Sequence, residues 1–342
     1  MSEDLRDPDA ETVDGELMLT LKPAPGLPVE LPAALHAELT ALLDQADQYA
    51  RAAQSVNTTR AYRSDWRQFQ AWCDRYGLQS IPASPTAVAL HLTALAQVGR
   101  SVSTVRRRCA AIARAHRIAG HTSPTADPSV MTVLEGIARV HGSAPNKKTA
   151  LLRDPRLEVI DRIDTSANAG MRDRALLLVG FALGLRRSEL VAIQVRDISP
   201  SPDGMTIRIA RSKTDQRGRG TSLLLPYAES PNPCPVRALR AWLDASGITE
   251  GAVFRRLSRA GKIGKPLTPQ SVALIVKRRA DAAGLDAREF AGHSLRSGYA
   301  TQAARDGHRT EQIAKTTRHK DQTVLAGYIH AGRGREDVAA VL

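Results

Sequence analysis

The sequence predicts a mainly α-helical protein of two domains with one small antiparallel β element. Its 342 residues are enough for two domains that each bury a core of their own. Apolar residues recur at helical spacing through most of the chain. Two alternating apolar–polar segments, 205–211 and 222–226, flank a turn-like stretch rich in Gly and Arg. That pattern predicts a β-hairpin inside the second, otherwise helical domain.

The first domain is expected over residues 33–142 as an all-α bundle, after an acidic, Pro-rich extension over 1–32 whose composition is typical of disorder. Helical periodicity covers residues 35–43 and continues along the segment with Trp66, Phe69 and Cys73. A third helix turns Arg106, Arg107 and Arg108 largely outward, and a fourth covers 128–141. The expected N-caps of the second and later helices are Thr58 or Thr59, Ser84, and Ser101 or Ser103.

Residues 143–154 are expected to form a basic linker, with 142–150 exposed, and residues 155–342 a second, α+β domain. The linker sequence nearly matches the pattern of a phosphate-binding P-loop, but Lys147 stands where that pattern requires its second glycine. Without that glycine the backbone cannot wrap a phosphate, so no nucleotide is expected as a partner. Helices are expected to end at Gly184 and to cover 234–245, 268–283, 294–306, 310–317 and 322–329.

The charge is distributed unevenly along the chain. Residues 1–50 carry eleven acids and two bases, whereas the remaining residues carry 46 bases and 24 acids. A body with a net charge of +22 indicates a polyanionic partner, most simply nucleic acid.

Composition also indicates the compartment. The three cysteines, Cys73, Cys109 and Cys234, lie far apart and form no zinc-binding spacing. No run of about 18 apolar residues predicts a membrane span, and the acidic N-terminus is unlike a signal peptide. We therefore expect a cytoplasmic protein associated with the nucleoid, with no metal and no membrane partner.

Six dispersed side chains of the second domain have the chemistry of phosphoryl transfer. A tyrosine, Tyr328, can attack phosphorus and form a covalent ester. Two guanidinium groups, Arg186 and Arg296, match phosphate oxygens, and His319 can donate a further hydrogen bond. His293 can handle a proton near neutral pH, and Lys213 can protonate the departing 5′ oxygen. Each residue alone is a weak indication, because the common explanation of each is structural, so the hypothesis depends on their order and spacing.

That order, Arg…Lys…His-x-x-Arg…His…Tyr, resembles the tyrosine recombinase (phage integrase) family. Its three boxes are similar to Leu-Gly-Leu-Arg-Arg-Ser-Glu-Leu, Gly-His-Ser-Leu-Arg and Arg-His-Lys-Asp-Gln-Thr-Val-Leu-Ala-Gly-Tyr-Ile-His of this chain. The resemblance spans roughly residues 40–342, and the segments around 71–73 and 102–117 look like those of Cre-like members. One departure is His319, since Cre itself has Trp at that position.

The resemblance implies a site-specific DNA recombinase that works through a 3′-phosphotyrosine intermediate without metal, ATP or other cofactor. It assigns Glu189 as an acidic support residue beside the catalytic Arg186, Lys213, His293, Arg296, His319 and Tyr328. It further implies a C-shaped clamp and a homotetramer on two double-stranded DNA sites, each an inverted repeat.

Contacts to DNA are expected from Tyr62, Arg106 and Arg107 of the first domain and from Lys147 and Lys148 of the linker. Two other functions share these residue types. A type IB topoisomerase would relax supercoiled DNA lacking any cognate site, and a non-catalytic DNA-binding regulator would form no covalent adduct.

Overall fold

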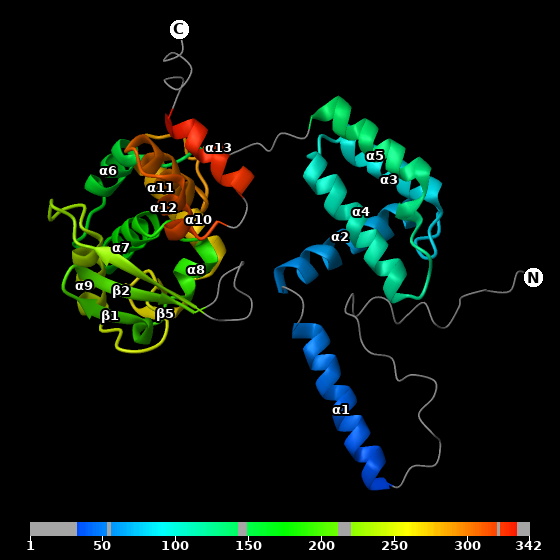
Figure 1. Ribbon diagram of the computed structural model, residues 1–342, viewed down its shortest axis with the longest axis horizontal. Helices are drawn as coiled ribbons and strands as arrows, with labels where there is room; N and C mark the ends of the chain where they lie inside the picture. The colour runs from blue at the N-terminus through cyan, green and yellow to red at the C-terminus, as the bar shows by residue number, and fades with distance from the viewer. Residues whose placement is uncertain (1–32, 53–55, 143–148, 211–219, 320–321, 334–342) are drawn as a thin grey trace, which may run out of the picture. The chain divides into compact units, whose positions relative to one another are not determined.

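The computed structural model describes residues 33–52, 56–142, 149–210, 220–319 and 322–333 (Figure 1). The chain divides into two compact units, residues 1–146 and 147–342. The acidic extension expected over 1–32 lies outside the described residues. Within the described part of the chain, no helix is both long and apolar enough to cross a membrane.

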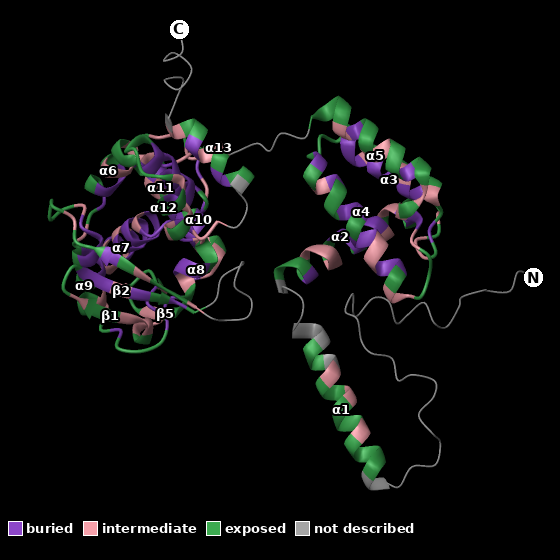
Figure 2. Ribbon diagram, in the orientation of Figure 1, coloured by how far each residue is buried: buried purple, intermediate pink, exposed green. Residues whose placement is uncertain are grey.

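The first unit is helical. Its elements are α1 (Ala33–Ala52), α2 (Val56–Arg75), α3 (Pro85–Gln97), α4 (Val102–Ile118), the short 3₁₀ helix η2 (Pro124–Ala126) and α5 (Pro128–His141). Helices α2 to α5 share a core in which Trp66, Phe69 and Val88 are at most 1% exposed. Most described side chains of α1 are instead exposed (Figure 2).

Two predicted helix starts of this unit are confirmed and one is wrong. Ser84 accepts the backbone N–H of Ala87 at 3.1 Å and caps α3, and Ser101 caps α4. The cap expected at Thr58 or Thr59 is wrong, because α2 already begins at Val56.

Arg108 does not point outward as predicted. Its side chain is buried because it turns toward α2, where its Nη2 donates to Gln68 Oε1 at 2.5 Å and its Nε lies 3.7 Å from Asp65 Oδ1. Arg106 and Arg107 are exposed, as predicted.

The second unit holds the remaining elements. Its helices are α6 (Arg153–Asp161), α7 (Asn168–Ala182), α8 (Arg187–Ala192), the 3₁₀ helix η3 (Val195–Asp197), α9 (Pro235–Ser246), α10 (Pro269–Ala282), α11 (Ser294–Arg305), α12 (Thr310–Thr317) and α13 (Gln322–Arg333). Its strands are β1 (Ile198–Ser201), β2 (Gly204–Ile209), β3 (Thr221–Pro226), β4 (Arg255–Leu257) and β5 (Ile263–Pro266).

The predicted hairpin is present as β2 and β3, which pair antiparallel with Ile207 opposite Leu223. The expectation of a single β element is wrong. Strand β1 extends the hairpin to a three-stranded sheet of order β1-β2-β3, and β4 and β5 form a second, two-stranded sheet. Of the linker predicted over 143–154, residues 143–148 lie outside the described residues, Leu151 is 1% exposed, and α6 begins at Arg153.

The core of the second unit surrounds α7, whose residues Leu176 to Val179 are fully buried (Figure 2). Helix α11 packs against α7 and against α13. Helix α7 therefore supports α11, whose start carries His293 and Arg296, and α11 supports α13, which carries Tyr328.

Candidate active site

The site begins at the turn between α7 and α8. Gly184 adopts a φ of +53°, a backbone conformation that glycine tolerates best, and the turn leads directly into Arg186. Arg186 occupies the N-cap position of α8, and its backbone N–H donates to Glu189 Oε2 at 2.9 Å. Local helix capping thus sets the position of Arg186 relative to Glu189.

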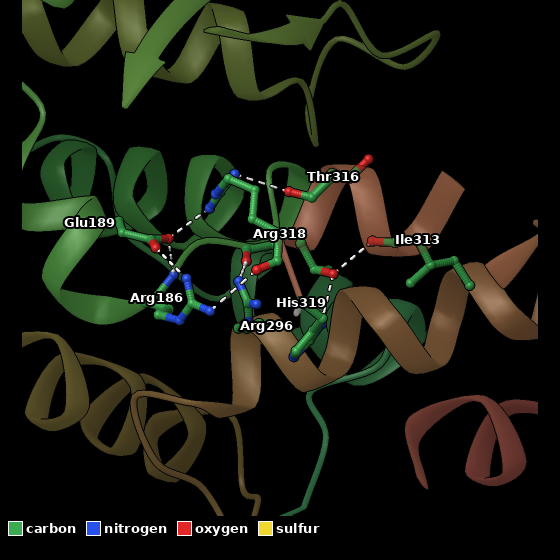
Figure 3. Close-up of polar contacts among 9 residues, drawn as sticks. Arg186, Glu189, Arg296, Ile313, Thr316, Arg318 and His319 are labelled. Carbon is green, nitrogen blue, oxygen red and sulfur yellow. Dashed lines mark hydrogen bonds and ion pairs between the residues drawn. The ribbon is translucent and has the colours of Figure 1, made fainter. Parts of the chain in front are cut away.

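Glu189 is only 2% exposed and joins two arginines that are far apart in the sequence (Figure 3). Its Oε1 lies 2.6 Å from Nη1 of Arg186, and its Oε2 lies 2.6 Å from Nη2 of Arg318. Burial acts to raise the pKa of Glu189, but Arg318 and the groups of Arg186 outweigh it and hold that pKa below its usual value. Glu189 is therefore ionised in the folded protein at neutral pH.

Arg318 closes the other end of this network. It ends α12 in the left-handed conformation, with a φ of +55° that is uncommon for a residue with a side chain. Its Nη1 donates to Thr316 O at 3.0 Å, and its own carbonyl accepts Arg186 Nη2 at 3.4 Å. The turn that leads into His319 is thereby attached to the Arg186 turn through Glu189.

The second predicted box lies at the start of α11, with His293 at the N-cap position and Arg296 in the first turn. Arg296 is 1% exposed, and its Nη1 donates to Gly184 O at 2.8 Å. Its Nη2 is buried and has no hydrogen-bond partner among the described residues. A buried, unpaired guanidinium nitrogen is costly, so this donor marks a place for an anionic oxygen.

Tyr328 is carried by α13, which lies close against α11. A side chain on Gly332 would place its Cβ only 2.5 Å from Thr301 O, so glycine permits this approach. Buried Leu325 and Ile329 of α13 pack with alanines of α11, which leaves Tyr328 at the edge of the same cluster. Its Oη lies 2.8 Å from His293 Nε2. The predicted nucleophile and the predicted proton acceptor are thus in direct contact.

Burial shifts the pKa values in this site most, and the neighbouring positive charges add to or oppose that shift. Desolvation lowers the pKa of His293, and Arg296, Arg186 and Arg187 lower it further. Burial, reinforced by Arg186, lowers the pKa of Arg296 to about 9. Burial raises the pKa of Tyr328, while Arg296 counteracts that increase. A protein that gathers like charges against their own repulsion is suited to bind an anion among them.

His319 follows Arg318 and completes the group. Its Nδ1 lies 2.7 Å from Thr317 Oγ1, and its ring centroid lies 5.9 Å from that of Tyr328. Burial and the positive charges of Arg296 and Arg186 lower the pKa of His319 to about 4. The ring is therefore neutral at pH 7 in the free protein.

The structure brings together residues of all three boxes: Arg186, Glu189, His293, Arg296, His319 and Tyr328. Lys213 lies outside the described residues. Sequence reasoning missed Arg318 and Thr317, whose roles depend on contacts within the folded chain. Within the described ranges, no group of three or more His, Cys, Asp or Glu side chains is placed to hold a metal ion.

The expected DNA contacts of the first unit lie on α2 and α4, which pack together (Figure 1). Tyr62 is half-buried, Arg106 is exposed, and Arg107 Nη1 lies 2.6 Å from Asp65 Oδ2. Lys147 and Lys148 lie outside the described residues. Sequence reasoning missed three arginines at helical spacing on α2, which line a hollow in its surface: Arg60, Arg63 and Arg67.

This arrangement combines a phenol, a neutral imidazole in contact with it, and a buried arginine with an unpaired nitrogen. Such a set of groups suits phosphoryl transfer to a tyrosine, in which fixed cations would meet the charge on phosphorus. The fold and the site are therefore those expected of an enzyme that cleaves nucleic acid through a tyrosine nucleophile.

Comparison with known proteins identifies the family. The model of the phage integrase family matches residues 154–334. The integrase/recombinase XerD homolog of Selenomonas ruminantium is 39% identical over 287 residues, which cover 83% of this chain and 84% of the relative. The recombinase Cre of Escherichia phage P1 is 24% identical over 298 residues, covering 82% and 85% of the two chains.

Solved structures share the fold. One is the XerH site-specific recombinase bound to its palindromic difH substrate, with a TM-score of 0.57 and 20% identity over 76% of this chain and 72% of that chain. Another is a lambda integrase (75–356) dimer bound to a COC′ core site, with a TM-score of 0.54 and 18% identity over 87% and 96% of the two chains.

The chain belongs to the phage integrase family of site-specific tyrosine recombinases, enzymes that cleave and rejoin DNA. The comparisons thus favour a recombinase over the topoisomerase and the non-catalytic regulator. Cre is also among the relatives, and the sequence predicted a likeness to Cre-like members. The Selenomonas relative is nevertheless more similar to this chain than Cre is.

Proposed function

We propose that Tyr328 cleaves one DNA strand at a time and that Arg186, Arg296, His293, His319, Glu189 and Lys213 assist it. The phenolic oxygen attacks phosphorus, a Tyr–O–P bond forms, and the bond from phosphorus to the 5′ oxygen breaks. The phenolic proton passes to His293, and Lys213 supplies a proton to the departing 5′ oxygen. Attack by a 5′ hydroxyl of the second DNA reverses these steps and releases the tyrosine.

The observation that carries this proposal is the pairing of two features within one site. Tyr328 Oη lies 2.8 Å from a histidine nitrogen that is neutral at pH 7 and able to accept its proton. Arg296 offers an unpaired buried nitrogen that a non-bridging phosphate oxygen would satisfy. Arg186, held by Glu189, supplies the second guanidinium.

The test is covalent trapping on a nicked suicide substrate, which loses the short fragment that carries the 5′ hydroxyl. We expect an adduct from the native chain and none from Tyr328→Phe, which keeps the ring but lacks the attacking oxygen. The matched control is Tyr299→Phe, because Tyr299 packs in the same cluster and has no proposed chemistry. Adduct formation by Tyr328→Phe would contradict the proposal.

We further propose that the substrate is double-stranded DNA with an inverted repeat, bound by four copies of the chain on two sites, so that the protein acts at the nucleoid. Solved neighbours support this, since one is a lambda integrase tetramer bound to a Holliday junction. The clamp shape implied by the family remains part of the same proposal.

We place a phosphate-contacting surface of the first unit on α2, at Arg60, Arg63 and Arg67, beside Arg106 and Arg107 of α4. Each phosphate contact contributes about 0.9 to the dependence of log affinity on log salt concentration. Replacing the three arginines of α2 by Gln is expected to reduce that slope by up to about 3 on random duplex DNA.

The control for this experiment is Arg139→Gln, since Arg139 is exposed on α5. An unchanged slope in the α2 variant would remove this surface from the DNA interface.

A further inference from the structure

Thr317 has two close polar contacts, and only one arrangement of protons satisfies both. The side chain is fully buried. Its Oγ1 lies 2.6 Å from Ile313 O and 2.7 Å from His319 Nδ1 (Figure 3). A carbonyl oxygen only accepts, and a hydroxyl has a single proton to donate. The hydroxyl proton therefore points to Ile313 O, a common bond for Thr in a helix.

The remaining contact requires His319 to be the donor. If Nδ1 were unprotonated, two lone pairs would face each other at 2.7 Å beside the fully buried Thr317 side chain, which is a repulsive contact. His319 in the free protein is consequently the Nδ1–H tautomer. Its Nε2 then carries a lone pair, which can accept a hydrogen bond but cannot donate one to an anion.

The surroundings of His319 keep it in this neutral form. Burial lowers its pKa most, and Arg296 on α11, Arg186 before α8, His293 and Arg318 in its own turn lower it further. The carboxylate of Glu189 is already paired with Arg186 and Arg318. The ring of Tyr328 on α13 lies against the His319 ring. An anion bound among these cations would reverse the balance, because its negative charge favours the imidazolium.

We propose that Thr317 sets the tautomer of His319, so that a phosphate entering the site is held by His319 only after that ring takes up a proton at Nε2. This inference rests on the proposed function for the identity of the anion. Thr317 is thus a positioning residue, since it acts on the anion through His319. Anion binding and proton uptake are coupled, and binding strengthens as the pH falls.

The first test does not depend on the proposed function. In ¹⁵N-histidine NMR spectra of the free full-length chain at pH 7, assigned with His319→Gln, we expect the His319 Nδ1 resonance to be that of a protonated nitrogen and Nε2 that of an unprotonated one. In Thr317→Val, which keeps the shape but not the acceptor, the protons redistribute toward Nε2. Thr317→Ser restores the native spectrum. An Nε2–H tautomer in the native chain would overturn the inference.

The second test uses sulfate, which does not titrate between pH 5 and 8. We expect the affinity of the native chain for sulfate to fall by up to about tenfold for each unit by which the pH rises. Tenfold per unit is the limit for the uptake of one proton. Thr317→Val should lose most of this dependence, while Thr317→Ser keeps it. His293 is present in all three proteins, so its own titration cancels in the comparison.

Equal pH dependence in the native chain and Thr317→Val would refute the coupling. Failure of the proposed function would be distinguishable, because it would abolish the Tyr328 adduct and leave the NMR result for the free protein unchanged.

Discussion

Removing the charge of Glu189 should destabilise the second unit strongly. In Glu189→Gln the size of the side chain is kept, but both 2.6 Å ion pairs, to Arg186 and to Arg318, are lost. The amide nitrogen of Gln would then face a guanidinium donor in a position that is 2% exposed in the native chain. The two partly buried cations, Arg186 and Arg318, would remain close together without the carboxylate between them.

Breaking a buried ion pair by removing one partner costs about 3–5 kcal/mol. For a unit of this size, 1 kcal/mol lowers Tm by about 2–4 °C. We therefore expect the thermal transition of the second unit to move down by about 6–20 °C. Residual solvent access at Arg186, whose side chain is 17% exposed, places the effect at the lower end of the energy range.

The assay is thermal unfolding followed by circular dichroism, with Glu311→Gln as the control because Glu311 is exposed on α12. The pH dependence supplies a second check. A carboxyl whose pKa is lowered by folding stabilises the protein above its unfolded pKa, and that contribution is lost as the pH falls through the folded pKa. The difference between native chain and Glu189→Gln should therefore shrink in acid.

A double-mutant cycle with Arg318→Met sharpens the test. Once Glu189 is neutral, removing Arg318 relieves repulsion, so the two substitutions should cost less together than their sum, by about 1–3 kcal/mol. A Tm change in Glu189→Gln no larger than that of the Glu311 control, or strict additivity in the cycle, would refute the account of Glu189.

Three further outcomes are expected from the proposed chemistry. Lys213→Ala should slow cleavage of ordinary DNA but not of DNA with a 5′-thiol leaving group, because a thiolate departs without a proton; equal slowing of both would exclude Lys213 as the acid. Cleavage and rejoining should persist in EDTA and without ATP, since the phosphotyrosine conserves the energy of the phosphodiester; loss of recombination with DNA binding intact would count against this. Single-turnover cleavage should lose rate in acid only below the ordinary pKa of histidine, because His293 must be neutral to accept the phenolic proton and its pKa is lowered; an acid limb that survives unchanged in His293→Asn would assign it to another group.

Much of the helical structure could be predicted because it depends on local features. Ser84 and Ser101 cap the helices that follow them, and the β2–β3 hairpin follows from alternation and an intervening turn. The missed strands lack such features. Strand β1 reads Ile-Ser-Pro-Ser and β5 reads Ile-Gly-Lys-Pro, so neither alternates apolar with polar residues, and pairing with a neighbouring strand makes each of them a strand.

The residue types of the site could be predicted from their order along the chain, but their supports could not. Arg318 meets Glu189 across 129 residues of sequence, and no local pattern indicates that its side chain turns inward. Arg108 was expected outside for the same reason, since its partner Gln68 lies 40 residues away. Long-range polar contacts decide the direction of a long, flexible side chain more than helical periodicity does.

The measurement that tests the central claim most directly is the location of the DNA-linked residue by mass spectrometry. Trypsin would release residues 321–333 as a peptide in which Tyr328 is the only tyrosine. After trapping on the suicide substrate and digestion with nuclease and trypsin, the account predicts a nucleotide attached to this peptide through a phosphotyrosine bond. Attachment to a peptide that lacks Tyr328, or through a 5′ rather than a 3′ phosphate, would contradict it.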